Sequence, residues 1–142
     1  ENRPAFRDAF KKRRCVVPAD GFYEWTEHKG ARQPIWFHRP DGGLILFAGL
    51  NESWQPAPGE WEPTFTIITT AANATLEPVH DRMPVILPQE VVDEWLYPRQ
   101  DDVAALSSLL VPASDDLLVG TPVSPRVNSV KNDDAACLEP LR

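Results

Sequence analysis

Glu24 is the first residue whose type and setting could support chemistry. It lies between Tyr23 and Trp25 in an otherwise apolar stretch that follows a tight turn. Aromatic neighbours that desolvate a carboxylate raise its pKa toward a value useful for proton transfer. Strand alternation could instead send Glu24 to solvent while Phe22 or Tyr23 packs inside. The sequence alone leaves both interpretations open.

His80 is the second such residue, in an irregular segment that continues to Arg82 and the constrained Pro84. Loops whose conformation is constrained in this way often carry functional sites. No second histidine follows at i+4, so the segment lacks the spacing of a helical zinc motif and predicts no metal site. A structural role suits a single histidine as well as a catalytic one. The other two histidines, His28 and His38, are expected at the surface.

The two cysteines offer a different kind of chemistry. Cys15 and Cys137 are far apart and have no second pair, which argues against a disulfide scaffold and for a reducing, cytoplasmic location. Free cysteines are usually buried as small apolar side chains. A cysteine hydrolase that uses Cys15 with His80 and Glu24 is an alternative, although it requires an exposed and activated thiol.

Basic residues gather at the start of an otherwise acidic chain. The formal net charge is −7. Residues 1–14 hold two acidic residues and six basic ones, namely Arg3, Arg7, Lys11, Lys12, Arg13 and Arg14. Such an opening can steer a phosphate backbone to one face, or it can be the solvated face of a helix. A noncovalent binder of single-stranded nucleic acid, with an exposed tryptophan stacked on a base, is therefore another alternative.

The length and composition indicate one globular domain. Hydrophobic residues make up 42% and charged residues 25% of the 142 residues. No apolar run approaches the roughly 20 residues of a membrane helix, and the start has no signal-peptide pattern. Fifteen prolines and seven glycines divide the chain into short elements. We expect an α+β fold with a mostly antiparallel, barrel-like sheet and peripheral helices.

Apolar spacing and turn residues predict where the elements lie. A helix is expected from Pro4 to about Arg13, and Asp101 or Asp102 can cap another. The two glycines within residues 40–43 predict a hairpin turn between the flanking strands. The expected strands are 15–17, 22–25, 35–38, 44–47, 65–70 and 117–119, the later helices are 90–96 and 103–110, and a Pro-rich loop is expected at 55–63.

Two long motifs occur in order along the chain. The first runs from Arg14 to Trp25 (RCVVPADGFYEW), and the second combines 69–73 (TTAAN) with 80–87 (HDRMPVIL). They resemble the motifs of the SRAP (SOS response-associated peptidase) family, and the resemblance extends from about Pro4 to the C-terminus.

This resemblance implies a DNA-repair protein that binds single-stranded DNA and crosslinks itself to abasic sites, as a monomer and without a cofactor. In the family, the amine of an N-terminal cysteine forms a Schiff base with the opened sugar, and its thiol closes a thiazolidine. Carried over by motif, Glu24 would shuttle protons and His80 would assist opening of the sugar. Trp25 and Thr69 match positions that line the DNA path, and Arg82 could contact phosphate.

The nucleophile of that chemistry is missing from the sequence. The family's opening third, which carries the N-terminal cysteine, has no counterpart here, and the sequence begins with Glu1. Neither Cys15 nor Cys137 is N-terminal, so neither offers the adjacent amine and thiol that a thiazolidine requires. We therefore expect a SRAP-like domain truncated at its N-terminus that does not crosslink DNA by itself.

Overall fold

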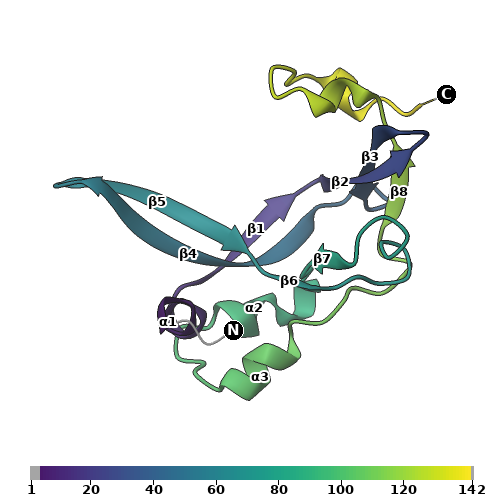
Figure 1. Ribbon diagram of the computed structural model, residues 1–142. Helices are drawn as coiled ribbons and strands as arrows, with labels where there is room; N and C mark the ends of the chain where they lie inside the picture. The colour runs from purple at the N-terminus through teal and green to yellow at the C-terminus, as the bar shows by residue number, and fades with distance from the viewer. Residues whose placement is uncertain (1–3, 142) are drawn as a thin grey trace. The chain divides into compact units, whose positions relative to one another are not determined.

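The computed structural model describes residues 4–141, except for the side chains of residues 4, 5 and 28. Short helices and antiparallel strand pairs make up the fold (Figure 1), which confirms the predicted α+β class. The elements in chain order are α1 (Pro4–Lys12), β1 (Arg14–Ala19), β2 (Gly21–His28), β3 (Ala31–His38), β4 (Ile45–Ala57), β5 (Glu60–Ile67), β6 (Thr69–Ala71), β7 (Arg82–Pro84), η1 (Gln89–Val91), α2 (Val92–Leu96), α3 (Val103–Ser108), β8 (Val119–Pro122), η2 (Pro125–Asn128) and η3 (Ala135–Leu138).

The described residues form two compact units. The first unit comprises 4–18, 46–70 and 84–113, and the second comprises 19–45, 71–83 and 114–141. The strands of the described chain are divided among three sheets, with the orders β1-β4-β5, β2-β3-β8 and β6-β7. Consecutive strands therefore do not always share a sheet.

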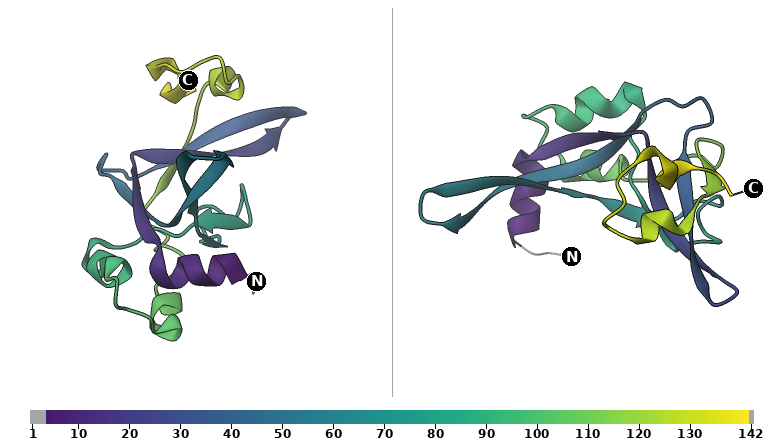
Figure 2. Two further views of the ribbon diagram at one scale, coloured as in Figure 1. Left: turned by 90° about the vertical axis from the view of Figure 1, so that its left-hand side faces the viewer. Right: turned by 90° about the horizontal axis from the view of Figure 1, so that it is seen from above.

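The core of the first unit lies between its helices and its strands. Figures 1 and 2 show α1, α2 and α3 together on one side of β1 and β4. Trp95 is fully buried there, with its ring edge-on to Phe10 at a centroid distance of 5.8 Å. Its indole N–H donates to the carbonyl oxygen of Cys15 at 2.9 Å, so the polar atom of this large side chain is satisfied.

Arg14 connects the C-terminal ends of α1 and α2 in the first unit. Its guanidinium donates to five carbonyl oxygens, those of Phe10 (2.8 Å), Lys11 (2.7 Å), Trp95 (2.6 Å), Tyr97 (2.7 Å) and Gln100 (3.0 Å). Carbonyl groups at helix C-termini have no partner within the helix, and a cation stabilises them. Burial lowers the pKa of the Arg14 guanidinium from its ordinary value. The charged group of Arg14 is therefore engaged in hydrogen bonds within the first unit.

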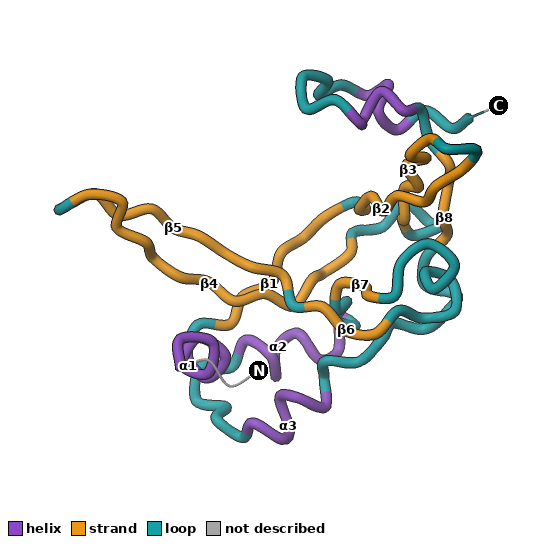
Figure 3. The backbone as a smooth tube through the Cα atoms, viewed as in Figure 1, coloured by secondary structure: helices purple, strands orange, loops and turns teal. Residues whose placement is uncertain are grey.

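Residues 55–63, predicted to be a Pro-rich loop, instead belong to a long β-hairpin, so that prediction is wrong. β4 and β5 pair in an antiparallel ribbon with an irregularity between Trp54 and Ala57 (Figure 3). The turn uses Gly59 at φ 86°, a conformation that favours glycine. Pro63 is tolerated because β5 is an edge strand, where a missing N–H breaks no essential ladder bond.

The turn at 40–43 was predicted correctly, but the hairpin around it was not. β3 and β4, which flank it, belong to different sheets. The turn is held by Asp41, whose carboxylate accepts from the amide of Gly43 at 2.9 Å and pairs with Arg39 at 2.6 Å. That guanidinium lowers the pKa of Asp41 to about 2. Local side chains therefore determine the turn, whereas strand pairing depends on segments distant in sequence.

Several predicted boundaries also shift. The strand expected at 117–119 is β8, which begins at Val119, and the strand expected at 65–70 is divided between β5 and β6. The helix predicted over 103–110 ends at Ser108. Its predicted cap is confirmed, because the Asp102 carboxylate accepts from the first free amides of α3 at 3.0 and 3.1 Å.

Gly21 begins β2 at a point where no larger side chain fits. A Cβ atom there would overlap Nε1 of Trp36 and lie 2.6 Å from the carbonyl oxygen of Phe37. Replacing Gly21 by Ala should therefore lower the free energy of unfolding, measured by urea titration, by about 2 kcal/mol. The matched control is Gly43→Ala, whose nearest neighbours are flexible ends of charged side chains at 3.0 Å. Equal losses in the two variants would contradict this explanation.

Candidate functional site

Strand β2 places the predicted site residues Glu24 and Trp25 on opposite faces of its sheet. Its pairing with β3 sets Glu24 opposite Ile35 and Trp25 opposite Pro34. Directly opposed residues of an antiparallel pair share a face, whereas successive residues alternate. Glu24 therefore shares the face of the buried Ile35.

Glu24 lies in an apolar setting. The same face carries Phe22, which stacks on the buried Phe37 with ring centroids 5.6 Å apart. Glu24 itself is half-buried. Among the described residues, no hydrogen bond or ion pair engages its carboxylate. The strand register therefore places Glu24 on the face that also carries Phe22, Ile35 and Phe37.

Trp25 lies on the other face and is held there by polar contacts. Its indole N–H donates to Oδ1 of Asn128 at 2.7 Å. The guanidinium carbon of Arg32 lies 5.3 Å from the ring centroid, within the range of a cation–π interaction. The Tyr23 ring lies beside it at a centroid distance of 6.1 Å. Trp25 is half-buried, so part of its ring remains accessible.

His80 lies at the end of a compact turn that Asn73 organises. The buried Asn73 accepts from the amide of Leu76 through its side chain at 3.0 Å and from the amide of Glu77 through its carbonyl at 2.9 Å. The carbonyl of Leu76, which is fully buried, then accepts from the amide of His80 at 3.0 Å. These hydrogen bonds fix the backbone of the turn, which places His80 at the surface.

The His80 ring is oriented by the backbone of Arg82. Nδ1 lies 3.0 Å from both the amide nitrogen and the carbonyl oxygen of Arg82, and 3.5 Å from Oδ1 of Asp81. The amide donates to an unprotonated Nδ1, whereas the carbonyl accepts from a protonated one. The backbone of Arg82 therefore orients the ring whichever tautomer it adopts.

Asn73 should be required for this arrangement. Replacing it by Ala leaves the Leu76 amide without its side-chain acceptor, and we expect a loss of about 1–2 kcal/mol in the free energy of unfolding. Amide hydrogen exchange at Leu76 and His80, followed by NMR, should accelerate. Asn73→Asp keeps the acceptor oxygen and should retain most of the protection. Unchanged exchange in Asn73→Ala would show that other contacts shape the turn.

Thr69 and Arg82 were predicted to contact DNA. Arg82 begins β7 and is exposed, in the same unit as Glu24, Trp25 and His80. Thr69 begins β6 in the other unit and is also exposed. Four of the five predicted residues therefore belong to one unit.

His38, which was expected at the surface, is half-buried. Its ring stacks on Trp36 with centroids 4.1 Å apart. Nδ1 lies 3.0 Å from the carbonyl oxygen of Arg39, and Nε2 lies 2.9 Å from Oγ1 of Thr121. Both ring nitrogens are engaged within the second unit, which makes His38 a structural residue. The side chain of His28 lies outside the described residues.

The basic residues near the start of the chain are less available for DNA than the sequence suggests. Arg13 pairs with Glu52 at 2.7 Å, and Arg14 is occupied by carbonyl groups. Arg3 lies outside the described residues, and Arg7 is exposed on α1. The positive surface of this stretch is therefore smaller than six basic residues would provide.

The tryptophans also differ in their exposure to solvent. Trp95 is fully buried, and Trp25 and Trp36 are half-buried. Trp54 and Trp61 are 57% and 64% exposed, and both lie on the β4–β5 hairpin. That hairpin also carries three glutamates and no basic residue, which disfavours a phosphate backbone. Trp25 is thus the tryptophan whose surroundings suit DNA better.

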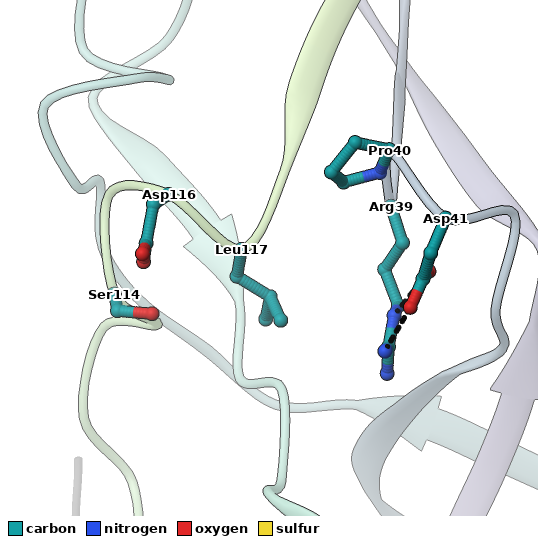
Figure 4. Close-up of a pocket in the computed structure, with 6 residues that line it drawn as sticks. All are labelled: Arg39, Pro40, Asp41, Ser114, Asp116 and Leu117. Carbon is teal, nitrogen blue, oxygen red and sulfur yellow. Dashed lines mark hydrogen bonds and ion pairs between the residues drawn. The ribbon is translucent and has the colours of Figure 1, made fainter.

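A pocket of about 250 Å³ lies within the second unit (Figure 4). Its walls come from residues 39–41 and 114–117, and Arg39 and Asp41 pair with each other across one side. It is lined by Arg39, Pro40, Asp41, Ser114, Asp116 and Leu117. No predicted site residue lines this pocket, so it does not contain the predicted chemistry.

The thiols are poorly placed for nucleophilic catalysis. Cys15 is half-buried in β1, and burial raises the pKa of its thiol, an effect that a hydrogen bond with Asn51 partly offsets. A raised pKa reduces the thiolate population at neutral pH. Cys137 is buried in η3. Neither thiol therefore supports the cysteine hydrolase alternative.

Among the described side chains, no group of three or more His, Cys, Asp or Glu residues is arranged to hold a metal ion. The helices of the described residues are all too short or too polar to span a membrane.

The motifs and the fold define a class of protein. The family model described as "SOS response associated peptidase (SRAP)" matches residues 1–130, and the chain belongs to this family. A crystal structure of a protein from Bacteroides thetaiotaomicron has a TM-score of 0.87 and 30% identity, covering 99% of this chain and 62% of that one. The resemblance found in the sequence is thereby confirmed.

Curated relatives carry one common name. Abasic site processing protein YoqW of Bacillus subtilis is 41% identical over 138 residues, which cover 96% of this chain and 62% of YoqW. Abasic site processing protein HMCES of Gallus gallus is 36% identical over 152 residues, covering 92% of this chain and 44% of that protein. The chain thus spans less than two thirds of these relatives.

Proposed function

We propose that this chain carries the acid–base and DNA-contacting residues of an abasic site processing protein that acts on single-stranded DNA. The proposal is supported by family membership and by the names of the relatives. Glu24 and His80 serve as the proton-transfer groups, and Trp25, Thr69 and Arg82 contact DNA.

The reaction proposed is formation of a thiazolidine at the abasic sugar. The α-amine of an N-terminal cysteine adds to the C1′ aldehyde of the ring-opened sugar, and loss of water gives a Schiff base. The cysteine thiol then adds to the imine carbon, and a proton moves to the nitrogen. His80 assists ring opening by proton transfer at the sugar oxygens, and Glu24 transfers the protons of the amine and the departing water.

The setting of Glu24 is the observation that carries this proposal. A half-buried carboxylate on a packed face, with no hydrogen bond or ion pair to the described residues, has its proton-accepting oxygens available for a substrate. A structural carboxylate in such a position would be expected to have a partner. Acid–base catalysis gives a reason for leaving it without one.

The proposed reaction needs an N-terminal cysteine, and the two cysteines of this sequence, Cys15 and Cys137, are internal. With the 142-residue chain, abasic single-stranded oligonucleotide should therefore give salt-sensitive noncovalent binding and no band that survives denaturation. A form of the protein that begins with a cysteine should give such a covalent band with a uracil-containing oligonucleotide and uracil glycosylase. Absence of the band, with an N-terminal cysteine verified by mass spectrometry, would overturn the proposal.

A further inference from the structure

The C-terminal segment of the second unit lies against the Trp25 face of β2. Figures 1 and 2 show residues 124–141 beside the β2–β3 hairpin. The connection is anchored by Val123, which is fully buried and whose amide donates to the carbonyl of Pro34 at 3.1 Å. Tyr23 adds a second anchor, because its hydroxyl donates to the carbonyl of Cys137 at 3.2 Å.

The segment is also braced internally, so that its position is defined. Arg126 forms a bidentate ion pair with Asp134, and its carbonyl accepts from Nδ2 of Asn132 at 2.8 Å. The hydroxyl of Ser124 accepts from the amide of Arg126 at 3.2 Å and caps η2. Asn128, the last residue of η2, is therefore held on a closed and supported loop.

The side chain of Asn128 makes two contacts that require one orientation of its amide. Oδ1 accepts from the Trp25 indole N–H at 2.7 Å, and Nδ2 donates to the carbonyl oxygen of Arg32 at 3.1 Å. An indole N–H can only donate and a carbonyl can only accept, so the reversed amide would lose both hydrogen bonds. Asn128 thus links the indole ring of Trp25 on β2 to the backbone of Arg32 on β3.

We propose that Asn128 is a positioning residue that holds the Trp25 indole in the orientation in which it contacts DNA. This inference rests on the proposed function and assigns a role to the C-terminal segment. Arg32, stacked over the ring, limits its rotation from one side. A ring that is already ordered loses less conformational freedom when a base packs on it, which strengthens binding.

The test uses the full chain and two readouts. The first is the indole ¹H–¹⁵N NMR signal of Trp25, assigned by its disappearance in Trp25→Phe. Asn128→Ala should shift this signal, whereas Asn128→Asp retains an acceptor oxygen and should keep it near its original position. Ser129→Ala, a neighbouring exposed residue, is the matched control and should leave the signal unchanged.

The second readout is affinity for a fluorescent single-stranded oligonucleotide. Asn128→Ala removes the hydrogen bond and Trp25→Phe removes the indole that it orients, and each should weaken binding about 3- to 10-fold. The double variant should be no weaker than the weaker single one, because Asn128 acts through Trp25. If Asn128→Ala does not fold, Asn128→Ser, which also lacks the side-chain amide, takes its place in both readouts.

The outcomes separate this inference from the proposed function. An indole signal that is unmoved in Asn128→Ala, or fully additive losses of affinity, overturns the positioning role and leaves the proposed function intact. A chain that does not bind single-stranded oligonucleotide at all refutes the proposed function instead. A shifted signal together with non-additive losses supports both.

Discussion

Replacing Glu24 by Gln should slow formation of the covalent DNA adduct by about 10²- to 10⁴-fold, the range that general acid–base groups contribute. The substitution keeps the size of the side chain and replaces its basic carboxylate by a neutral amide. Because Glu24 has no hydrogen bond or ion pair among the described residues, folding should be little affected. The rate is measured by denaturing gel on a form of the protein whose N-terminal cysteine is verified by mass spectrometry, using an abasic single-stranded oligonucleotide.

The same strand supplies the control for this experiment. Glu27 is an exposed carboxylate on the opposite face of β2, and Glu27→Gln should leave the rate within about twofold. His80→Gln should also slow the reaction, since it removes the second proton-transfer group. Equal rates for Glu24→Gln and Glu27→Gln would exclude Glu24 from catalysis.

Replacing Arg14 by Met should lower the free energy of unfolding by about 3 kcal/mol, because five carbonyl groups lose a charged donor. Met retains the apolar stem of the side chain, so lost packing contributes little. Arg14→Lys should recover part of the loss, since an ammonium has three donors and lacks the planar fork of a guanidinium. Urea titration followed by circular dichroism measures these differences.

A matched basic residue distinguishes a structural Arg14 from a DNA-contacting one. Lys12 is exposed on α1, and Lys12→Met should change the free energy of unfolding by less than about 0.5 kcal/mol. If Arg14→Met leaves stability unchanged and weakens DNA binding, then the side chain acts in the basic stretch that the sequence suggested.

Features set by neighbouring residues could be predicted from the sequence. The helix that begins at Pro4, the cap at Asp102 and the turn at 40–43 all depend on groups within a few positions of each other. The motifs that contain Glu24 and His80 could be recognised because each consists of residues that are close together in the sequence. Family membership followed from these motifs and was confirmed by the comparisons.

Features that depend on distant residues were not predicted. The prolines at 55–63 suggested a loop because the sequence does not reveal that β5 is an edge strand. The two strands around the turn at 40–43 pair with other partners, since pairing is chosen by the packing of whole sheets. The hydrogen bond between Asn128 and Trp25 was not predicted, because the two residues lie far apart in the chain.

The amino-acid sequence by itself determined which residues bear the proposed chemistry, the family and the α+β class. The tertiary structure decided where these and other residues lie and which groups they contact. Register with β3 placed Glu24 on the packed face, and five carbonyl groups converted Arg14 from a surface charge into a structural tie. The physical reason is that motifs and local turns depend on residues that are neighbours in the sequence. Burial and hydrogen-bond partners arise only when segments distant in the sequence pack together.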